Sequence, residues 1–316
     1  MAVLHAEATG TSRVSRMRHA PPSKRRARRR RTAVGLAFMA PLLLINLVVI
    51  AIPGAESVYY SFTDWTGIGG ANFVGFANYT RLFGDPDFRN ALLHNLEWTA
   101  FFLTVPMALG LFGAFLLSRI RRFQVLFRIA FFVPYVVATV VSGAIWQILL
   151  SPDQGIGAGL SNLGIHWLAN VNFLGDPHLA LGAVAFVNTW QWWGFLVVIF
   201  LAAMQAVNPA QYEAARLDGA NAWQEFWHIT LPGIRPTLMF LALMTVIWSF
   251  LIFDYVYILT QGGPAGSTDV LGTLLYRDAF SNQEAGYAAA IGVVMALISV
   301  IAVSSFLYLR RRGWDI

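Results

Sequence analysis

The sequence predicts an all-α membrane protein whose chain crosses the bilayer as six helices. Of its 316 residues, 57% are hydrophobic and only 12% are charged, whereas a soluble domain carries about a quarter charged residues. Six apolar stretches are each long enough to cross a hydrocarbon core of roughly 30 Å as a helix. Such lengths far exceed the ~10-residue alternating strands of a membrane barrel, so helices are the predicted element.

Residues 1–32 are polar and end in a run of lysine and arginine, and we expect them to form a disordered basic cytoplasmic tail. The apolar run that follows, about 34–58, is longer than a signal-peptide core and has no convincing cleavage site. It therefore predicts a retained membrane anchor. Nucleic-acid binding is the competing interpretation of the arginines, but a basic cluster beside a span is ordinarily a topology signal at the anionic inner leaflet.

The transmembrane domain is expected to cover 33–316, with a core over about 91–309. After the anchor, spans are predicted at about 91–118, 123–150, 179–205, 237–260 and 287–309. Pro41, Pro106 and Pro134 lie inside spans and predict kinks rather than breaks, because neighbouring helices can satisfy the freed carbonyl groups.

The positive charges predict the orientation of the chain. If the amino terminus is inside, all but three of the 22 lysine and arginine residues lie on the cytoplasmic side, the exceptions being Arg81, Arg89 and Arg277. Cytoplasmic loops of membrane proteins are enriched in these residues. We therefore expect a multi-pass protein of a bacterial-type cell membrane, with both termini and the loop between spans four and five in the cytoplasm.

Composition excludes several kinds of site. The chain has no cysteine, so disulfides and thiolate metal sites are excluded. Its only lysine is Lys24 in the tail, so a phosphate-binding loop that ends in Gly-Lys-Ser/Thr does not exist here. No catalytic cluster or metal site is expected, and no cofactor is expected on this chain. If ATP drives the protein, another chain binds it.

The loop over 206–236 predicts a cytoplasmic helical hairpin. Asn208-Pro209 is a helix-start signal, since asparagine caps helices and proline suits the first turn. Gly219 lies where a left-handed residue would end that helix. A second short helix, about 223–230, is expected to end at Leu231-Pro232, and Glu213 is expected on the exposed side of the first.

A helix lying on the inner leaflet is the alternative interpretation of this loop. Helices of that kind favour basic polar faces. Here Glu213, Asp218 and Glu225 stand against Arg216 alone. This acidity next to an anionic leaflet favours a protein partner.

The fourth span carries Asn188-Thr189-Trp190-Gln191-Trp192-Trp193 near its centre. Buried amides cost several kcal/mol unless they are paired or face a wet cavity. Ring faces that stack on a sugar and amides that bond its hydroxyl groups would suit a saccharide path. Hydrogen bonds between helices are the alternative role. Asp254 in the fifth span is a further candidate, because intramembrane carboxylates are usually functional.

The loop carries a series of small, acidic and apolar residues at fixed spacing: Glu213-Ala214-Ala215, Asp218-Gly219-Ala220, Phe226, Ile229, Leu231-Pro232 and Pro236. This series resembles the EAA loop of binding-protein-dependent ABC importer permeases. Further stretches resemble carbohydrate-type permeases similar to the larger permease subunit of the maltose transporter: 61–65, 73–79, 188–190, 259–264 and 286–290. The resemblance covers about residues 33–312.

This resemblance implies the ABC type-1 permease fold, with a cytoplasmic coupling helix between helices four and five. It implies contact with the ATPase through Glu213, Ala214, Ala215, Asp218, Gly219, Leu231 and Pro232. It also implies the partners: a second permease subunit, two ABC ATPase domains that bind ATP-Mg, and an extracytoplasmic solute-binding protein. The expected function is half of the translocation path for a sugar or oligosaccharide.

The resemblance also implies which residues face the substrate. Together with the polar stretch of span four, it predicts a substrate path along Asn188, Trp190, Gln191, Trp192, Phe195, Thr245, Ser249 and Ile252. Asn188 matches the family and other positions differ, which implies a sugar site of altered specificity. An outer gate or structural role is expected for Asp254, Gly262, Gly263 and Pro264.

Alternative functions make different demands on the sequence. An ion- or proton-driven carrier needs no docking hairpin and often carries paired intramembrane charges, whereas Asp254 is nearly alone here. A membrane enzyme needs a cluster of nucleophile, base or metal ligands, which the sequence lacks. The same importer class could also carry a polyol or a glycerol-phosphate derivative.

Overall fold

The structure is a computed structural model that describes residues 24–120, 122–168 and 171–311. The described chain is helical, and its only β feature is an isolated bridge between Thr63 and Phe73. Residues 1–23 of the predicted tail, and Arg121 and Arg312 of the charge count, lie outside the described residues.

The chain divides into two compact units, Met1–Ala55 and Glu56–Ile316. In the first, α1 (Lys24–Asn46) and η1 (Leu47–Ala51) lead into α2 (Ile52–Tyr60), which runs across the boundary. The end of the tail predicted to be disordered is therefore helical from Lys24 onward. The apolar helix Val34–Tyr60 has none of its most apolar window buried, so its described side chains suit a lipid environment.

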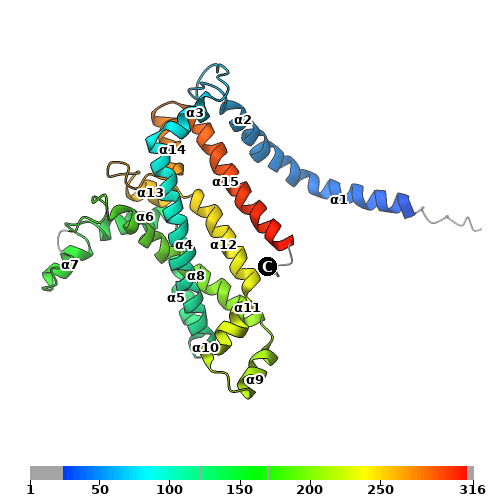
Figure 1. The fold of residues 1–316 in the computed structure, drawn as a ribbon, viewed down its shortest axis with the longest axis vertical. Coiled ribbons are helices and arrows are strands. Elements are labelled where there is room, and N and C mark those ends of the chain that lie inside the picture. The colour runs from blue at the N-terminus through cyan, green and yellow to red at the C-terminus, as the bar shows by residue number, and fades with distance from the viewer. Residues whose placement is uncertain (1–23, 121, 169–170, 312–316) are drawn as a thin grey trace, which may run out of the picture. The chain divides into compact units, whose positions relative to one another are not determined.

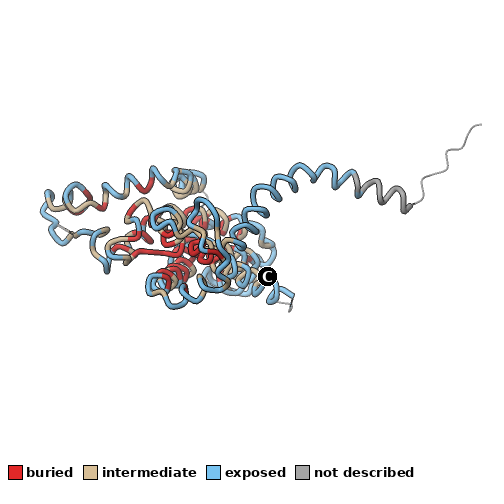
Figure 2. The backbone as a smooth tube through the Cα atoms, turned by 90° about the horizontal axis from the view of Figure 1, so that it is seen from above, coloured by how far each residue is buried: buried red, intermediate tan, exposed pale blue. Residues whose placement is uncertain are grey.

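The second unit holds the remaining helices, and all residues that Figure 2 colours as buried belong to it. In chain order they are α3 (Ala77–Gly84), α4 (Pro86–Arg119), α5 (Gln124–Val136), α6 (Thr139–Leu149), α7 (Ile156–Asn162), α8 (Ala180–Ala206), α9 (Pro209–Leu217), α10 (Ala222–Glu225), η2 (Phe226–Thr230), α11 (Leu231–Gly233), α12 (Arg235–Phe250), α13 (Asp254–Leu259), α14 (Leu271–Tyr276), η3 (Arg277–Ser281) and α15 (Ala285–Arg311) (Figure 1).

Four helices of the described chain are long and apolar enough to cross a membrane, and up to six spans result if each of two bent helix pairs counts as one. The predicted all-α membrane fold is thereby confirmed.

Helix α4 is the central element of the second unit. It packs against α8, α12, α14, α5 and α3, and it contributes residues to all three buried apolar clusters. Its start is fixed by Asp85, whose side chain accepts a hydrogen bond from the Asp87 N–H (2.9 Å), and by Pro86 in the first turn.

Glycines let α4, α5 and α8 approach closely. A Cβ atom on Gly110 of α4 would lie 2.5 Å from the Cβ of Leu196 in α8. One on Gly194 of α8 would lie 1.7 Å from the carbonyl oxygen of Phe131 in α5. Both distances are far below van der Waals contact, so this packing requires glycine, as is common where membrane helices meet.

The third predicted span, 123–150, is broken rather than kinked. Helices α5 and α6 meet at an angle of 93°, and Val137 and Ala138 between them are extended. The break lies after Pro134, the expected kink. It is tolerated because the Gln191 side chain of α8 donates a hydrogen bond to the Val137 carbonyl oxygen (2.7 Å).

The fifth predicted span, 237–260, is also interrupted. Helix α12 ends at Phe250, residues 251–253 are not helical, and α13 starts at Asp254. Asp254 is therefore an exposed residue at the start of a short helix, not a carboxylate inside a continuous span. At the other end of α12, the helical stretch Ala222–Gly233 meets it at 68° and belongs to the hairpin.

Candidate functional site

The hairpin over 206–236 begins with α9, whose two ends are set by short-range hydrogen bonds. The Asn208 side chain accepts from the Ala210 N–H (3.0 Å), and proline follows it at the first helical position. At the other end, Gly219 has a φ of +82°, and the Ala220 N–H bonds back to the Ala215 carbonyl oxygen (2.9 Å). The predicted start and stop of this helix are both confirmed.

The second half of the hairpin is a helical stretch from α10 through η2 to α11. A capping box starts it: the Asn221 side chain accepts from the Gln224 N–H (3.0 Å), and the Gln224 side chain accepts from the Asn221 N–H (2.8 Å). The helix predicted at about 223–230 is confirmed and extends to Gly233.

The outer surface of the hairpin combines acidic and apolar groups. Of the residues predicted to contact an ATPase, Ala215 and Leu231 are half-buried, and the exposed ones are Glu213, Ala214, Asp218, Gly219 and Pro232. Leu217 beside them is 90% exposed, and Trp223 is 58% exposed. Sequence reasoning missed these two. The available signal was large apolar side chains in a polar loop, which fit a protein contact better than water.

Glu225 does not belong to this exposed acidic surface, contrary to the prediction. Its side chain is only 4% exposed and is bonded by two guanidinium groups, Arg216 Nε to Oε1 (2.6 Å) and Arg119 to Oε2 (3.0 Å). The hydrogen bond from Arg216, with that from Arg119, holds the pKa of Glu225 below its ordinary value. Glu213 and Asp218 are left as the exposed acids.

A cavity of about 160 Å³ lies among α4, α8 and the end of α12. It is lined by Trp98, Phe102, Asn188, Trp192, Thr245, Trp248, Ser249 and Ile252. The structure thus brings together five of the predicted substrate-path residues: Asn188, Trp192, Thr245, Ser249 and Ile252. It adds Trp98, Phe102 and Trp248. Helical spacing was the available signal, since Trp248 is one turn from Thr245 and Phe102 is one turn from Trp98.

The cavity offers hydroxyl, amide and ring groups and no charged side chain among its lining residues. The Thr245 Oγ1 atom is buried and has no hydrogen-bond partner among the described residues. Leaving such a group unpaired costs about 1–3 kcal/mol. Trp192 and Trp248 meet edge to face, with ring centroids 4.7 Å apart. This arrangement suits a polar, uncharged solute with both hydroxyl groups and an apolar face.

Three predicted path residues lie outside the cavity lining. Gln191 bonds the Val137 carbonyl and accepts from the Tyr255 hydroxyl (2.6 Å), so it connects helices. Trp190 packs edge to face on Trp146 with ring centroids 5.5 Å apart. Phe195 stacks on Tyr135 at 4.8 Å. Hydrogen bonding between helices, the alternative role for the amides, therefore applies to Gln191.

The predicted outer feature over 262–264 is a tightly bonded turn. Gly262 has a φ of +86°, and its position leaves no room for a side chain beside the carboxylate of Asp269. The Thr268 hydroxyl donates to the Gly263 carbonyl oxygen (2.8 Å), and the Gly263–Pro264 bond is cis. Within the described chain, no hydrogen bond or ion pair joins exposed Asp254 to this turn.

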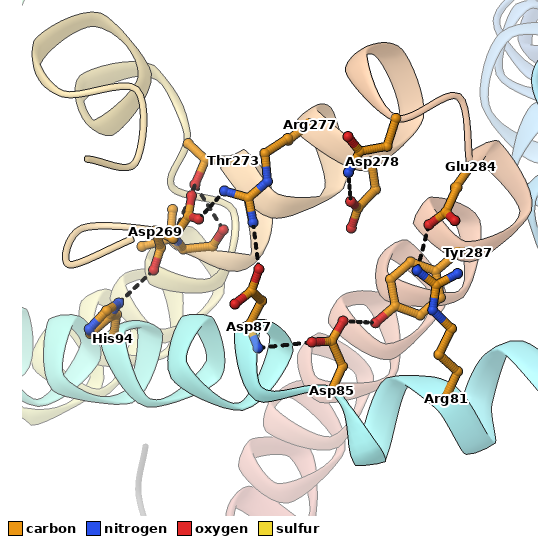
Figure 3. A network of polar contacts seen from close by, with 12 residues as sticks. Arg81, Asp85, Asp87, His94, Asp269, Thr273, Arg277, Asp278, Glu284 and Tyr287 are labelled. Carbon is orange, nitrogen blue, oxygen red and sulfur yellow. Dashed lines mark hydrogen bonds and ion pairs between the residues drawn. The ribbon is translucent and has the colours of Figure 1, made fainter. Parts of the chain in front are cut away.

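Polar contacts connect the chain after this turn, from Asp269 through η3 to the start of α15, with the amino-terminal part of α4 and its N-cap residue Asp85 (Figure 3). Arg277 forms ion pairs with buried Asp269 and with Asp87 (3.3 Å). The His94 ring bonds the Asp269 carbonyl oxygen (2.7 Å), and the Tyr287 hydroxyl donates to Asp85 (2.6 Å). The network holds the 260–287 region on the amino-terminal part of α4.

The sequence pattern of the family described as "Binding-protein-dependent transport system inner membrane component" matches residues 106–314. A probable ABC transporter permease of Pyrococcus horikoshii is 33% identical, over 88% of this chain and 96% of its own. The permease of the diacetylchitobiose uptake system of Streptomyces coelicolor is 35% identical, over 92% of this chain and 86% of its own.

A solved structure shares the fold. A chain from a bacterial ABC transporter that imports the acidic polysaccharide alginate superposes with a TM-score of 0.80 at 24% identity, over 92% of this chain and 99% of its own. A second structure of an alginate ABC transporter, with the same TM-score, contains a periplasmic protein bound to an alginate pentasaccharide.

Proposed function

Because the chain belongs to the family of binding-protein-dependent transport system inner membrane components, we propose that it forms half of the translocation path of an ABC importer for sugars or oligosaccharides. The hairpin carries this proposal. It is a short, capped helical unit between two spanning segments, with exposed Glu213 and Leu217 available to a partner. A rigid helix of this kind transmits the movement of a docked ATPase to α8 and α12.

The proposed partners follow from what this chain lacks. Its only lysine is Lys24, so it has no phosphate-binding loop, and ATP-Mg is bound by two separate ATPase domains. A second permease completes the path. An extracytoplasmic solute-binding protein delivers the solute, which agrees with the family description and with the periplasmic protein in the alginate transporter structure.

The proposed solute path passes the cavity at Asn188 and Thr245. The buried hydroxyl of Thr245 has no hydrogen-bond partner in the part of the chain that the structure describes, and Trp192 and Trp248 offer ring edges and faces to the same space. A saccharide supplies matching groups, because its hydroxyl groups pair with Thr245 and Asn188 while its C–H faces stack on the rings. The saccharide permease of Streptomyces coelicolor supports this class of solute.

The solute-binding protein that delivers solute to this permease is the component whose ligand identifies the cargo. We expect calorimetry to show that it binds a neutral saccharide, and that reconstituted transporter takes up the same saccharide only with ATP. Uptake that persists without ATP and collapses with the proton gradient would overturn the proposal in favour of a secondary carrier.

Thr245→Val tests the cavity within that assay. Valine keeps the shape and removes the unpartnered hydroxyl, so we expect equal or higher thermal stability of the purified complex. Uptake of the saccharide should fall about tenfold at limiting concentration, as for one lost hydrogen bond in a binding site. Thr104→Val is the control: Thr104 lies on α4, is exposed, and bonds only its own helix. Equal uptake by both variants would contradict the assigned path.

A further inference from the structure

The inner end of α4 is joined to the hairpin by two ion pairs that share one buried carboxylate. Arg119, the last residue of α4, bonds Glu225 Oε2 at 3.0 Å, and Arg216 of α9 bonds Oε1 at 2.6 Å. Glu225 itself belongs to α10. We call this group of three side chains, Arg119, Glu225 and Arg216, the clamp.

The clamp has a defined geometry, unlike a solvated surface pair. The Glu225 side chain is 4% exposed, so its charge has lost most of its water and depends on the two guanidinium groups. Arg119 also donates to the Ala222 carbonyl oxygen (3.3 Å) and lies 4.8 Å from the ring centroid of Phe115. Arg119 thereby fixes the position of α10 against the last turn of α4.

Helix α4 is attached to the hairpin in a different way from α8 and α12. Helices α8 and α12 are continuous with the hairpin along the chain, whereas α4 is far from it in sequence and contacts it through the side chains of Phe115 and Arg119. The apolar part of this contact, with the rings of Phe115 and Phe226 4.9 Å apart, is non-directional and permits sliding. The charge-assisted hydrogen bonds from Arg119 fix direction and register.

The same helix extends from the hairpin to α3 and α14 (Figure 1). Trp98 and Phe102 of α4 line the cavity. Fully buried Asn95 donates to the Ser249 carbonyl oxygen (2.7 Å) and accepts from the Leu271 N–H (2.8 Å), which joins α4 to the ends of α12 and α14. A displacement of α4 along its axis therefore moves cavity walls on two helices.

We propose that Glu225 is a positioning residue that makes α4 follow the hairpin, so that movement imposed by an ATPase reaches the cavity through α4 as well as through α8 and α12. The inference rests on the proposed function, because it requires an ATPase on the hairpin. Of the two ion pairs in the clamp, Arg119–Glu225 is the one that links the hairpin to α4. Arg216–Glu225 connects two parts of the hairpin.

Two matched variants test the two ion pairs of the clamp one at a time. Arg119→Met removes the link to α4 and leaves Glu225 paired with Arg216, whereas Arg216→Met does the reverse. The side chains of Arg119 and Arg216 are 41% and 62% exposed, so neither change opens a core cavity. Both variants are made in a chain that carries Ser249→Cys, which places a reporter thiol at the cavity. The native chain has no cysteine, so this is its only thiol.

The assay compares labelling of that thiol by a small methanethiosulfonate reagent in the reconstituted complex, at rest and after trapping with ATP and vanadate. We expect Arg119→Met to reduce the ATP-dependent change in labelling rate about tenfold, the factor for one lost charge-assisted hydrogen bond. We expect Arg216→Met to reduce it less, because this variant leaves the Arg119–Glu225 link to α4 in place. Both variants should retain the ATPase and its hydrolysis of ATP.

Three results would overturn the inference. The ATP-dependent change in labelling rate could be as large in Arg119→Met as in the Ser249→Cys parent, it could be reduced equally in Arg119→Met and Arg216→Met, or Arg119→Met could lose the bound ATPase. Should Arg119→Met fail to insert, Arg119→Gln provides the same test, because it also removes the charged link to Glu225 and leaves Arg216 in place. A parent complex with no ATPase bound and no ATP-dependent labelling would instead refute the proposed function.

Discussion

At the scale of single residues, the two glutamates of the hairpin differ in environment. Glu213 is exposed on α9, whereas Glu225 is buried beneath it between two guanidinium groups. An exposed carboxylate is available to a basic group of another protein, while a buried and paired one is not. The two residues should therefore fail in different ways when they are replaced.

Glu213→Lys should leave insertion intact and weaken association with the ATPase by more than about tenfold, because it brings like charges together in the complex. Co-purification of the ATPase from membranes measures this, with saccharide uptake as the second readout. Gln211→Lys, on the same helix and also exposed, is the matched control. Wild-type uptake in Glu213→Lys would refute the docking role.

The lowered pKa of Glu225 makes a pH-dependent contribution to stability. Because the folded-state pKa lies below the unfolded one, near 4.3 for glutamate, stability from this group is fully present above that value. It is lost as pH falls through the folded pKa. We expect thermal stability in detergent to decline below about pH 4.3, and Glu225→Gln to decline less steeply over the same range. Parallel declines would contradict the assignment.

Asn188 and Gln191 show how far residue roles follow from sequence. Both are amides near the centre of one span, and burial cost alone indicates that each needs a partner or a wet cavity. Asn188 lines the cavity, whereas Gln191 bonds the broken backbone at Val137. Which neighbour each side chain meets depends on the packing of other helices, and no periodicity within the span contains that information. Arg119 and Glu225 are likewise distant in sequence, so their pairing left no local signal.

At the scale of elements, close helix packing depends on glycines with no room for a side chain. Gly194 of α8 lies against the Phe131 carbonyl oxygen of α5, and Gly110 of α4 lies against Leu196. These contacts place α8 between α4 and α5 and set the distance of its cavity-lining face from α4. Helix existence was predictable from apolar length, but the breaks in spans three and five were not. Each broken span is one predominantly apolar stretch in the sequence, and its carbonyl groups at Val137 and Ser249 accept hydrogen bonds from the distant side chains of Gln191 and Asn95.

Gly194→Ala should destabilise the purified protein by about 1–3 kcal/mol, because the added methyl group overpacks a contact with backbone. Gly182→Ala on the same helix is the matched control, since a Cβ there meets nothing within 4 Å. Alanine is also the better helix former by about 0.5–1 kcal/mol. In thermal unfolding measured in detergent, the midpoint temperature should therefore be lower for Gly194→Ala and not for Gly182→Ala. Similar midpoints for both variants would contradict the packing.

At the scale of the whole molecule, the distribution of arginines predicts that the hairpin and the turn over 262–264 lie on opposite sides of the membrane. The absence of native cysteine makes this directly testable. Leu217→Cys, exposed on α9, should react with an impermeant maleimide only in inverted vesicles. Ser281→Cys, exposed before α15, should react only in right-side-out vesicles. Labelling of both from one side would refute the six-span topology.

The two interrupted spans have a shared mechanical consequence. Helices α6 and α13, each beyond a break, pack on one another, with a hydrogen bond between the Tyr255 and Ser142 hydroxyl groups across the contact (3.0 Å). Each is separated from its longer partner by a few non-helical residues. The Gln191 side chain of α8 bonds both the Val137 carbonyl oxygen at the first break and the Tyr255 hydroxyl after the second, so one side chain ties both interrupted spans to α8.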